Sequence, residues 1–303
     1  MKRLDFFPAA LLAAAFLVGA CNVETGTEST TEVDRNGTKP LRIAFIAYQN
    51  PDQLLESVEP VTEYLKAELG RPIEAFAATD YAGIVEALKA GSADAGFMGP
   101  LQYVIAHHQS GAVPILGELY NGAPTYVSHV FVRKDSGIES LEDLEQTSMA
   151  FVDPLSSSGY MFPLDTFLQA GLIESPRSAE DFFRKIYFAG GDEQAIRAVL
   201  NKFVDAAGVG QYSVKLLRPE EREQLVAIAS SRPIPSHCVV VRAELDAETA
   251  SELQQALLGL NQGDHQELLR NLYAVDGYVE ADHETYRSVE ALAREYGFLD
   301  SAG

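Results

Sequence analysis

The strongest constraint on this chain is an alternation of strand and helix patterns that begins at Pro40 and covers most of its length. The short apolar run over 41–47 is typical of a buried strand. The apolar positions of 54–65 that follow repeat with helical spacing, and Gly70 is a stop signal. Pro60 predicts either a kink in this helix or a new start capped by Glu59. Such alternation favours an α/β fold with largely parallel sheets.

Length and charge narrow the class of protein. A chain of 303 residues is long enough for about two domains. It carries 23 basic and 44 acidic residues, a formal net charge of −21. Nucleic-acid binding needs clustered basic side chains against phosphates, so this balance argues against it. The same charge argues against a protein whose body lies on an anionic membrane.

The N-terminal segment is expected to be a targeting signal rather than part of the fold. Residues 6–18 are an apolar run too short to span a bilayer but suited to a signal peptide. The run ends in Val18-Gly19-Ala20-Cys21, which resembles a bacterial lipobox. We therefore expect residues 1–21 to be a lipoprotein signal with lipid on Cys21, and 22–40 to be a flexible tether. A plain secretory signal with a coincidental cysteine is the alternative.

Other chemistries find little support. With Cys21 lipidated, Cys238 has no disulfide partner, and its apolar surroundings predict a buried strand position. The adjacent His107 and His108 would project apart on a helix, and the remaining histidines are scattered, so we expect no metal site. The chain contains no phosphate-binding Walker loop, no dinucleotide fingerprint and no Gly-x-Ser-x-Gly elbow. We expect neither a cofactor nor an enzyme.

The loop Ser156-Ser157-Ser158-Gly159 is the most informative local feature. It follows a predicted strand and opens a predicted helix, whose first N–H groups lack intrahelical partners. Together with the helix dipole and three hydroxyls, these N–H groups predict an anion site, where the glycine would allow close approach. An N-capped turn that binds nothing is the other interpretation.

Several short motifs, in this order and spacing, resemble the periplasmic binding proteins for phosphonate, phosphite and related oxyanions that feed ABC transporters. They are Tyr81-Ala82-Gly83-Ile84-Val85-Glu86-Ala87-Leu88, Gly99-Pro100-Leu101-Gln102-Tyr103, Tyr126-Val127-Ser128, 132–138, 151–163, Val204-Asp205-Ala206 and Pro233-Ile234-Pro235. The resemblance covers about 41–300.

That resemblance implies a type II binding fold, with two Rossmann-like α/β lobes joined by two hinge crossings. One lobe would comprise 41–128 plus 235–303, and the other 129–234. The crossings would lie near 128–130 and 233–237, and the lobes would close on the ligand.

The candidate ligand-binding residues come from the serine loop and from positions facing the expected cleft. They are Ser156, Ser157, Ser158, Gly159, Tyr48, Tyr81, Tyr103, Tyr126, Ser128, Asp192 and Asp205. The tyrosine hydroxyls would donate to ligand oxygens, although each ring could equally be a packing residue. Asp205 matches a family position that contacts an amine or an acidic proton of the ligand, and a plain turn residue is the alternative.

One position departs from the family pattern. Where the family usually has Gly-Gly-His-Asp or Gly-Ser-His-Asp, this chain reads Gly190-Gly191-Asp192-Glu193. A carboxylate at 192 would repel a dianion unless it accepts a proton or an N–H from the ligand. A protonated oxyanion, an aminophosphonate and a different solute all remain open.

The sequence thus predicts a monomeric, lipid-anchored extracytoplasmic protein that captures a small oxyanion by cleft closure. Its partner would be an ABC permease in the inner membrane. The alternatives are presentation of a ligand to a membrane histidine kinase, or binding of a different small solute.

Overall fold

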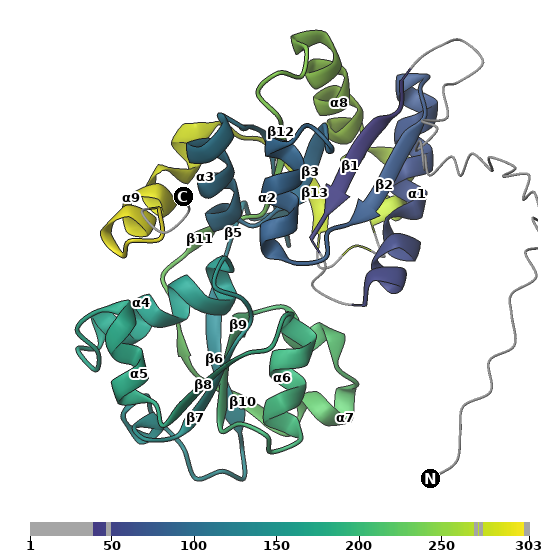
Figure 1. The fold of residues 1–303 in the computed structure, drawn as a ribbon. Helices are drawn as coiled ribbons and strands as arrows, with labels where there is room; N and C mark the ends of the chain where they lie inside the picture. The colour runs from purple at the N-terminus through teal and green to yellow at the C-terminus, as the bar shows by residue number, and fades with distance from the viewer. Residues whose placement is uncertain (1–38, 47–49, 270–271, 273–274, 300–303) are drawn as a thin grey trace, which may run out of the picture. The chain divides into compact units, whose positions relative to one another are not determined.

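The computed structural model describes residues 39–46, 50–269, 272 and 275–299, all within one compact unit, Val33–Gly303. The predicted signal peptide, Cys21, Tyr48 and nearly all of the tether lie outside the described residues. Two separate β-sheets each carry their own helices (Figure 1). The prediction of two α/β lobes is therefore confirmed. No helix in the described ranges combines the length and apolar content that crossing a bilayer requires.

The first lobe is built on a six-stranded sheet in the order β13-β4-β12-β3-β1-β2. Its strands are β1 (Leu41–Phe45), β2 (Ile73–Ala77), β3 (Ala95–Met98), β4 (Val113–Tyr120), β12 (Cys238–Val241) and β13 (Val275–Glu280). Its helices are α1 (Pro51–Leu69), α2 (Tyr81–Lys89), α3 (Pro100–Ser110), α8 (Ala247–Gly259) and α9 (Arg287–Glu295). Cys238 is fully buried in β12, as predicted.

The second lobe is built on a five-stranded sheet in the order β10-β6-β9-β7-β8. Its strands are β6 (Ser128–Arg133), β7 (Ser148–Phe151), β8 (Lys185–Phe188), β9 (Ala206–Gly210) and β10 (Leu225–Ser230). Its helices are α4 (Phe162–Gln169), α5 (Ala179–Phe182), α6 (Asp192–Leu200) and α7 (Pro219–Arg222).

Apolar side chains point from both faces of this sheet, and helices cover both faces. Met149 and Phe151 of β7 join the core that includes α4, whereas Ala150 and Val152 join the core that includes α6. Successive strand residues point to opposite faces, so both sides of the strand are apolar and both must be covered. Figure 1 shows α4 and α5 on one side of the sheet and α6 on the other.

Two short strands carry the chain between the sheets. The chain leaves the first sheet through β5 (Thr125–Tyr126) and returns through β11 (Ile234–Pro235). These strands pair with each other in antiparallel register, with Tyr126 opposite Ile234. Both of those residues are buried, so the two crossings form one hydrogen-bonded ribbon.

The expectation of largely parallel sheets is wrong. β12 pairs antiparallel with β3 and β4, and β6 pairs antiparallel with β9 and β10. β6 and β12 follow directly after the crossing strands, with no helix to turn the chain back first. Strand–helix alternation predicts parallel neighbours only within βαβ units. A strand that enters a sheet directly from the other lobe is not part of such a unit, so it can pair antiparallel.

The first helix is continuous through Pro60, so a new start at Glu59 is wrong. The Asn50 side chain caps it by accepting from the Asp52 amide at 3.0 Å, and left-handed Gly70 ends it as predicted. The apolar stripe of 54–65 is fully buried, and this burial outweighs the backbone hydrogen bond that proline cannot make.

We predict that Phe167→Ala lowers the free energy of unfolding by about 3–5 kcal/mol, because Phe167 is fully buried in the α4 core. Phe203→Ala is the matched control, since that ring is 75% exposed and should change stability by only about 0.5 kcal/mol. Urea unfolding of both variants measures the difference. Equal effects would contradict the packing described.

Candidate binding site

Four helices begin around one small cavity. Tyr81 starts α2, Gly99 precedes α3, Asp192 starts α6, and Ser156 precedes the π-helical turn Ser157–Met161 that leads into α4. Amide groups in a first helical turn lack intrahelical partners and carry partial positive charge. The cavity, here called the serine cavity, is lined by Ile46, Tyr81, Gly99, Tyr120, Tyr126, Ser156, Ser157, Ser158, Asp192, Gly210, Tyr212 and His237.

The serine cavity is small and lacks positively charged side chains. Its volume is about 20 Å³. None of the described residues that line it is lysine or arginine. The described residues also contain no cluster of three or more His, Cys, Asp or Glu side chains that could hold a metal ion. The arrangement therefore suits a small, compact ligand held by neutral donors.

The serine loop is held by its own backbone. The Ser156 hydroxyl accepts a hydrogen bond from the Gly159 amide at 3.0 Å, and the Val152 amide donates to the Gly159 carbonyl at 2.9 Å. A Cβ on Gly159 would lie 2.3 Å from Val152 Cγ2. The glycine thus lets Val152 approach the loop closely. The sequence interpretation had the glycine allow a ligand, rather than Val152, to approach.

Ser157 joins the two lobes. Its hydroxyl oxygen accepts a hydrogen bond from the Leu101 amide in the first turn of α3 at 2.8 Å. Because the oxygen is the acceptor in this bond, the hydroxyl proton can still be donated into the cavity. The Gln102 side chain braces the same corner by accepting from Gly99 N at 3.0 Å and donating to the Tyr81 carbonyl at 2.8 Å.

Ser128 supports the loop rather than lining the cavity. Its side chain is buried, and its hydroxyl lies 2.5 Å from the Ser158 carbonyl and 3.3 Å from the Val209 carbonyl, to which it donates. Both contacts direct its proton to backbone oxygens. Ser128, predicted as a ligand-binding residue, therefore acts on the position of Ser158.

Tyr81 and Tyr126 bring two hydroxyls to the serine cavity, and both rings are about 5% exposed. Burial raises the pKa of each hydroxyl well above its ordinary value, and the nearby Asp192 charge adds to the shift. Hydrogen bonds with Ser156 and Ser158 oppose it only in part. Both groups therefore stay protonated and can donate hydrogen bonds.

Asp192 places a carboxyl group on the cavity wall. Its Oδ1 accepts from the Ser213 hydroxyl at 2.7 Å and from the Gly210 amide at 3.3 Å. Burial raises the pKa of this carboxyl, although these two hydrogen bonds act in the opposite direction.

The sequence interpretation missed a polar group on the facing wall. His237 lies 3.7 Å from Glu118, measured from Nδ1 to Oε2, and its Nε2 lies 3.4 Å from the Tyr126 hydroxyl. Tyr120 donates to Glu118 Oε2 at 2.6 Å. Burial raises the pKa of Glu118 to about 7 and lowers that of His237 to about 4, so the imidazole is neutral. The sequence signal that could have revealed this pair is the acidic Glu118 within the otherwise apolar stretch 115–119.

Two predicted site residues lie elsewhere. Tyr103 is fully buried in the first lobe, where its hydroxyl is 2.7 Å from His283 Nδ1 and its ring packs against Tyr286. Asp205 precedes β9 and accepts from the Ser148 amide and hydroxyl, whereas the cavity residue Gly210 ends that strand. Neither residue is among those that line the serine cavity.

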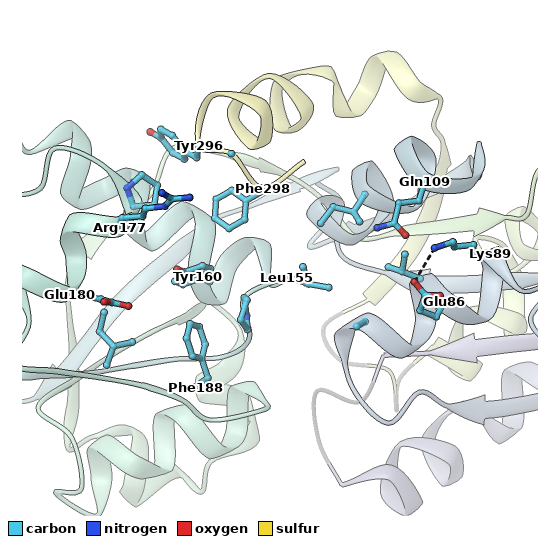
Figure 2. Close-up of a pocket in the computed structure, with 17 residues that line it drawn as sticks. Glu86, Lys89, Gln109, Leu155, Tyr160, Arg177, Glu180, Phe188, Tyr296 and Phe298 are labelled. Carbon is cyan, nitrogen blue, oxygen red and sulfur yellow. Dashed lines mark hydrogen bonds and ion pairs between the residues drawn. The ribbon is translucent and has the colours of Figure 1, made fainter. Parts of the chain in front are cut away.

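A larger cavity of about 620 Å³ has a different character. Leu155, Tyr160, Phe188 and Phe298 supply much of its wall (Figure 2). Its charged lining includes both signs, as in the Lys89–Glu86 ion pair at 3.5 Å. Its lining includes Tyr160, Tyr296 and the first turn of α2 but not the serine triplet or the starts of α3 and α6. The serine cavity, where four helix starts meet, is therefore the better candidate for an anion.

Two α/β lobes, two crossing strands and a small cavity lined from both lobes define a two-lobed binding protein. The chain belongs to the family of periplasmic substrate-binding proteins of phosphonate ABC transporters, whose model matches residues 43–286. The resemblance inferred from the motifs is confirmed. The family is one of transport binding proteins, as expected, and not of enzymes.

Individual relatives agree with this assignment. The chain is 32% identical over 197 residues to the phosphate-import protein PhnD of Mycolicibacterium smegmatis, covering 63% of this chain and 61% of that one. It is 30% identical over 223 residues to the phosphonates-binding periplasmic protein of Escherichia coli, covering 71% and 64%. The chain thus spans less than two thirds of the length of these relatives.

A solved structure is similar in fold. The binding protein component of an ABC phosphonate transporter from Pseudomonas aeruginosa matches with a TM-score of 0.78 at 24% identity. The match covers 87% of this chain and 88% of that one. The predicted two-lobed periplasmic binding fold is confirmed.

We predict that Gly159→Ala lowers the melting temperature by several degrees, because the added Cβ would overlap the Val152 side chain. Gly83→Ala is the matched control, since its Cβ would meet two side-chain oxygens at 3.3 Å and the Ala78 Cβ at 3.8 Å, with no overlap like that at Gly159. Thermal unfolding followed by circular dichroism compares the two. Equal melting temperatures would show that the loop does not depend on this contact.

Proposed function

We propose that this chain captures a small phosphorus oxyanion, such as a phosphonate, phosphite or phosphate, in the serine cavity and delivers it to an ABC permease. The observation that carries the proposal is the convergence of four helix N-termini and several hydroxyls on one cavity with neutral lining donors. Helix N-termini of this kind bind anions without a cationic side chain. Phosphate and phosphonates also appear in the names of the relatives above.

In this proposal, the Ser157 and Ser158 amides and the hydroxyls of the loop hold the oxyanion, because the Ser156 and Gly159 amides already donate within the loop. Tyr81 and Tyr126 donate from the other lobe and the crossing. A hydrogen bond to a charged group contributes about 1.5–3 kcal/mol. Four or five such bonds, less the cost of ordering the ligand, are enough for a free energy near about −8 kcal/mol, which is micromolar affinity.

Capture would be coupled to movement of the lobes. We propose that 41–128 plus 235–303 and 129–234 move as bodies about the paired strands β5 and β11. The hydrogen bond from Leu101 to Ser157 and the bond of 2.9 Å from Asn121 Nδ2 to the Tyr212 hydroxyl join residues of the two lobes. These bonds favour the closed arrangement, which the permease would recognise.

The same proposal places the protein outside the cytoplasmic membrane as a monomer. Lipid on Cys21 would anchor it, and the tether of 22–40 would span roughly 20–25 Å. The high negative charge does not prevent anion capture, since screening limits exposed charges to about 8 Å.

We predict that the double variant Ser157→Ala, Ser158→Ala binds its oxyanion at least tenfold more weakly while remaining folded. It loses two donors that face the serine cavity but keeps the backbone of the loop. Isothermal titration with methylphosphonate, phosphite and phosphate measures the loss. Tyr103→Phe is the control, because that hydroxyl contacts His283 instead. A full loss of affinity in the control, or none in the double variant, would contradict the assignment.

We predict that Cys21→Ser releases the protein from membranes when it is expressed in a bacterium that processes lipoproteins. Fractionation into membrane and soluble material measures the change. Cys238→Ala serves as the comparison, since that thiol is buried in β12 and should leave the protein with the membranes. Release of both variants, or of neither, would rule out lipid on Cys21 as the anchor.

A further inference from the structure

The serine cavity contains a carboxyl group without a compensating cation among its described lining residues. Asp192 is 7% exposed and lies at the first position of α6. The imidazole on the facing wall is not a cation near neutrality, because burial lowers the pKa of His237 to about 4. An anion that enters this cavity therefore meets donors on most sides and a carboxyl group on one.

Hydrogen bonds from neighbouring residues to Asp192 use one of its two oxygens. The Gly210 amide and the Ser213 hydroxyl both donate to Oδ1, and the residue's own amide is a further donor to the carboxyl group. These donors hold the carboxyl group in place. A carboxylate has lone pairs for more partners than these, so it can accept a further hydrogen bond from a donor on a ligand in the cavity.

Two anionic oxygens cannot share a buried site without a proton between them. Removing water strengthens their repulsion, and one of the two groups then keeps its proton, as in paired carboxylates. A phosphorus oxyanion can supply that proton from a P–OH group. A fully ionised anion, or one whose acid is too strong to hold a proton, has none to offer, so its complex must take one up from solution and loses affinity.

We propose that the ligand is bound with one acidic proton shared between its oxygen and Asp192. The serine cavity then selects oxyanions that carry a P–OH group over anions of similar shape without one. This inference rests on the proposed function and adds the protonation state of the ligand to it.

The ionisable groups around Asp192 are consistent with a shared proton. Those on or near the cavity are Tyr81, Tyr126, Tyr120, Tyr212, Asp153, Glu118 and His237. Burial raises the pKa of Asp192 and also that of Glu118, to about 7. None of these groups supplies a positive charge near neutrality, so the proton itself must offset the repulsion.

The sign of the pH dependence follows from the proton count. Where the free ligand still carries its P–OH proton, binding needs no further proton. Where that proton is lost at higher pH, the complex must take one up, and affinity falls by about tenfold for each pH unit. Acidification back to neutrality should restore binding.

The experiment is calorimetric titration of the full mature chain at pH 6 to 9 in buffers of different ionisation enthalpy. The probes are methylphosphonate, which can carry P–OH, methanesulfonate, a monoanion of similar shape without an acidic proton, and sulfate, a dianion. We expect methylphosphonate to bind at least tenfold more tightly than either of the others at pH 7. We also expect uptake of about one proton above the ligand's last ionisation.

Variants identify the group that shares the proton. Asp192→Asn replaces an acceptor with a donor of the same shape, so it should abolish proton uptake and bind methanesulfonate more tightly than the unchanged protein does. Asp205→Asn is the matched control, since Asp205 accepts from Ser148 at the other end of β9, and it should behave like the unchanged protein. Glu118→Gln tests the second buried acid.

The outcomes separate this inference from the proposed function. Tight methylphosphonate binding without proton uptake, or equal binding of methanesulfonate, overturns the inference and leaves the function intact. Loss of uptake in Glu118→Gln but not in Asp192→Asn overturns the assignment to Asp192. Failure of methylphosphonate, phosphite and phosphate to bind at every pH overturns the proposed function, and the inference with it.

Discussion

The backbone contact between Val152 and Gly159 is the interaction on which the rest of the site depends. The Val152 amide at the end of β7 donates to the Gly159 carbonyl, and the missing Cβ of Gly159 lets the two segments approach. This bond folds 153–158 into a tight loop, so that three consecutive serines line one cavity. The start of α4 is thereby tied to the sheet, and its first amides have a fixed direction.

The remaining polar groups fall into two sets around this loop. Donors come from the loop, from the tyrosines and from the first turn of α3, while Asp192 and Glu118 supply carboxyl groups. Neutral donors in a dry site act at contact distance and are insensitive to charges on the protein surface. A net charge of −21 on the chain is therefore compatible with the proposed anion site.

The sequence predicted the parts of the site that depend on local order along the chain. A strand, a serine loop and a helix start suffice to place Ser156, Ser157 and Ser158, and a helix start likewise places Tyr81 and Asp192. Asp205 was chosen from the family resemblance, which does not say which end of β9 faces the cavity, and it lies at the other end. Tyr103 lies outside the serine cavity, because a position near a helix start does not reveal which face of the helix is buried.

The residues that were missed depend on contacts between distant parts of the chain. Glu118 in β4 and His237 beside β12 meet only because those strands are neighbours in the mixed sheet, which the rule for parallel sheets did not foresee. The sequence analysis considers the histidines only as metal ligands, so it does not predict that a single imidazole beside the return crossing lines the cavity.

Main-chain amides and side chains contribute different properties to the serine cavity, and this difference affects how such a protein can evolve. Amides at helix starts are present whatever the side chains are, so point mutations cannot easily erase the general attraction for anions. The side chains at 192 and 237, by contrast, can each be replaced by a single change without disturbing the loop that Val152 and Gly159 hold. Under the proposed function, descendants of one ancestor can therefore keep the same main-chain site while changing which anion the side chains select.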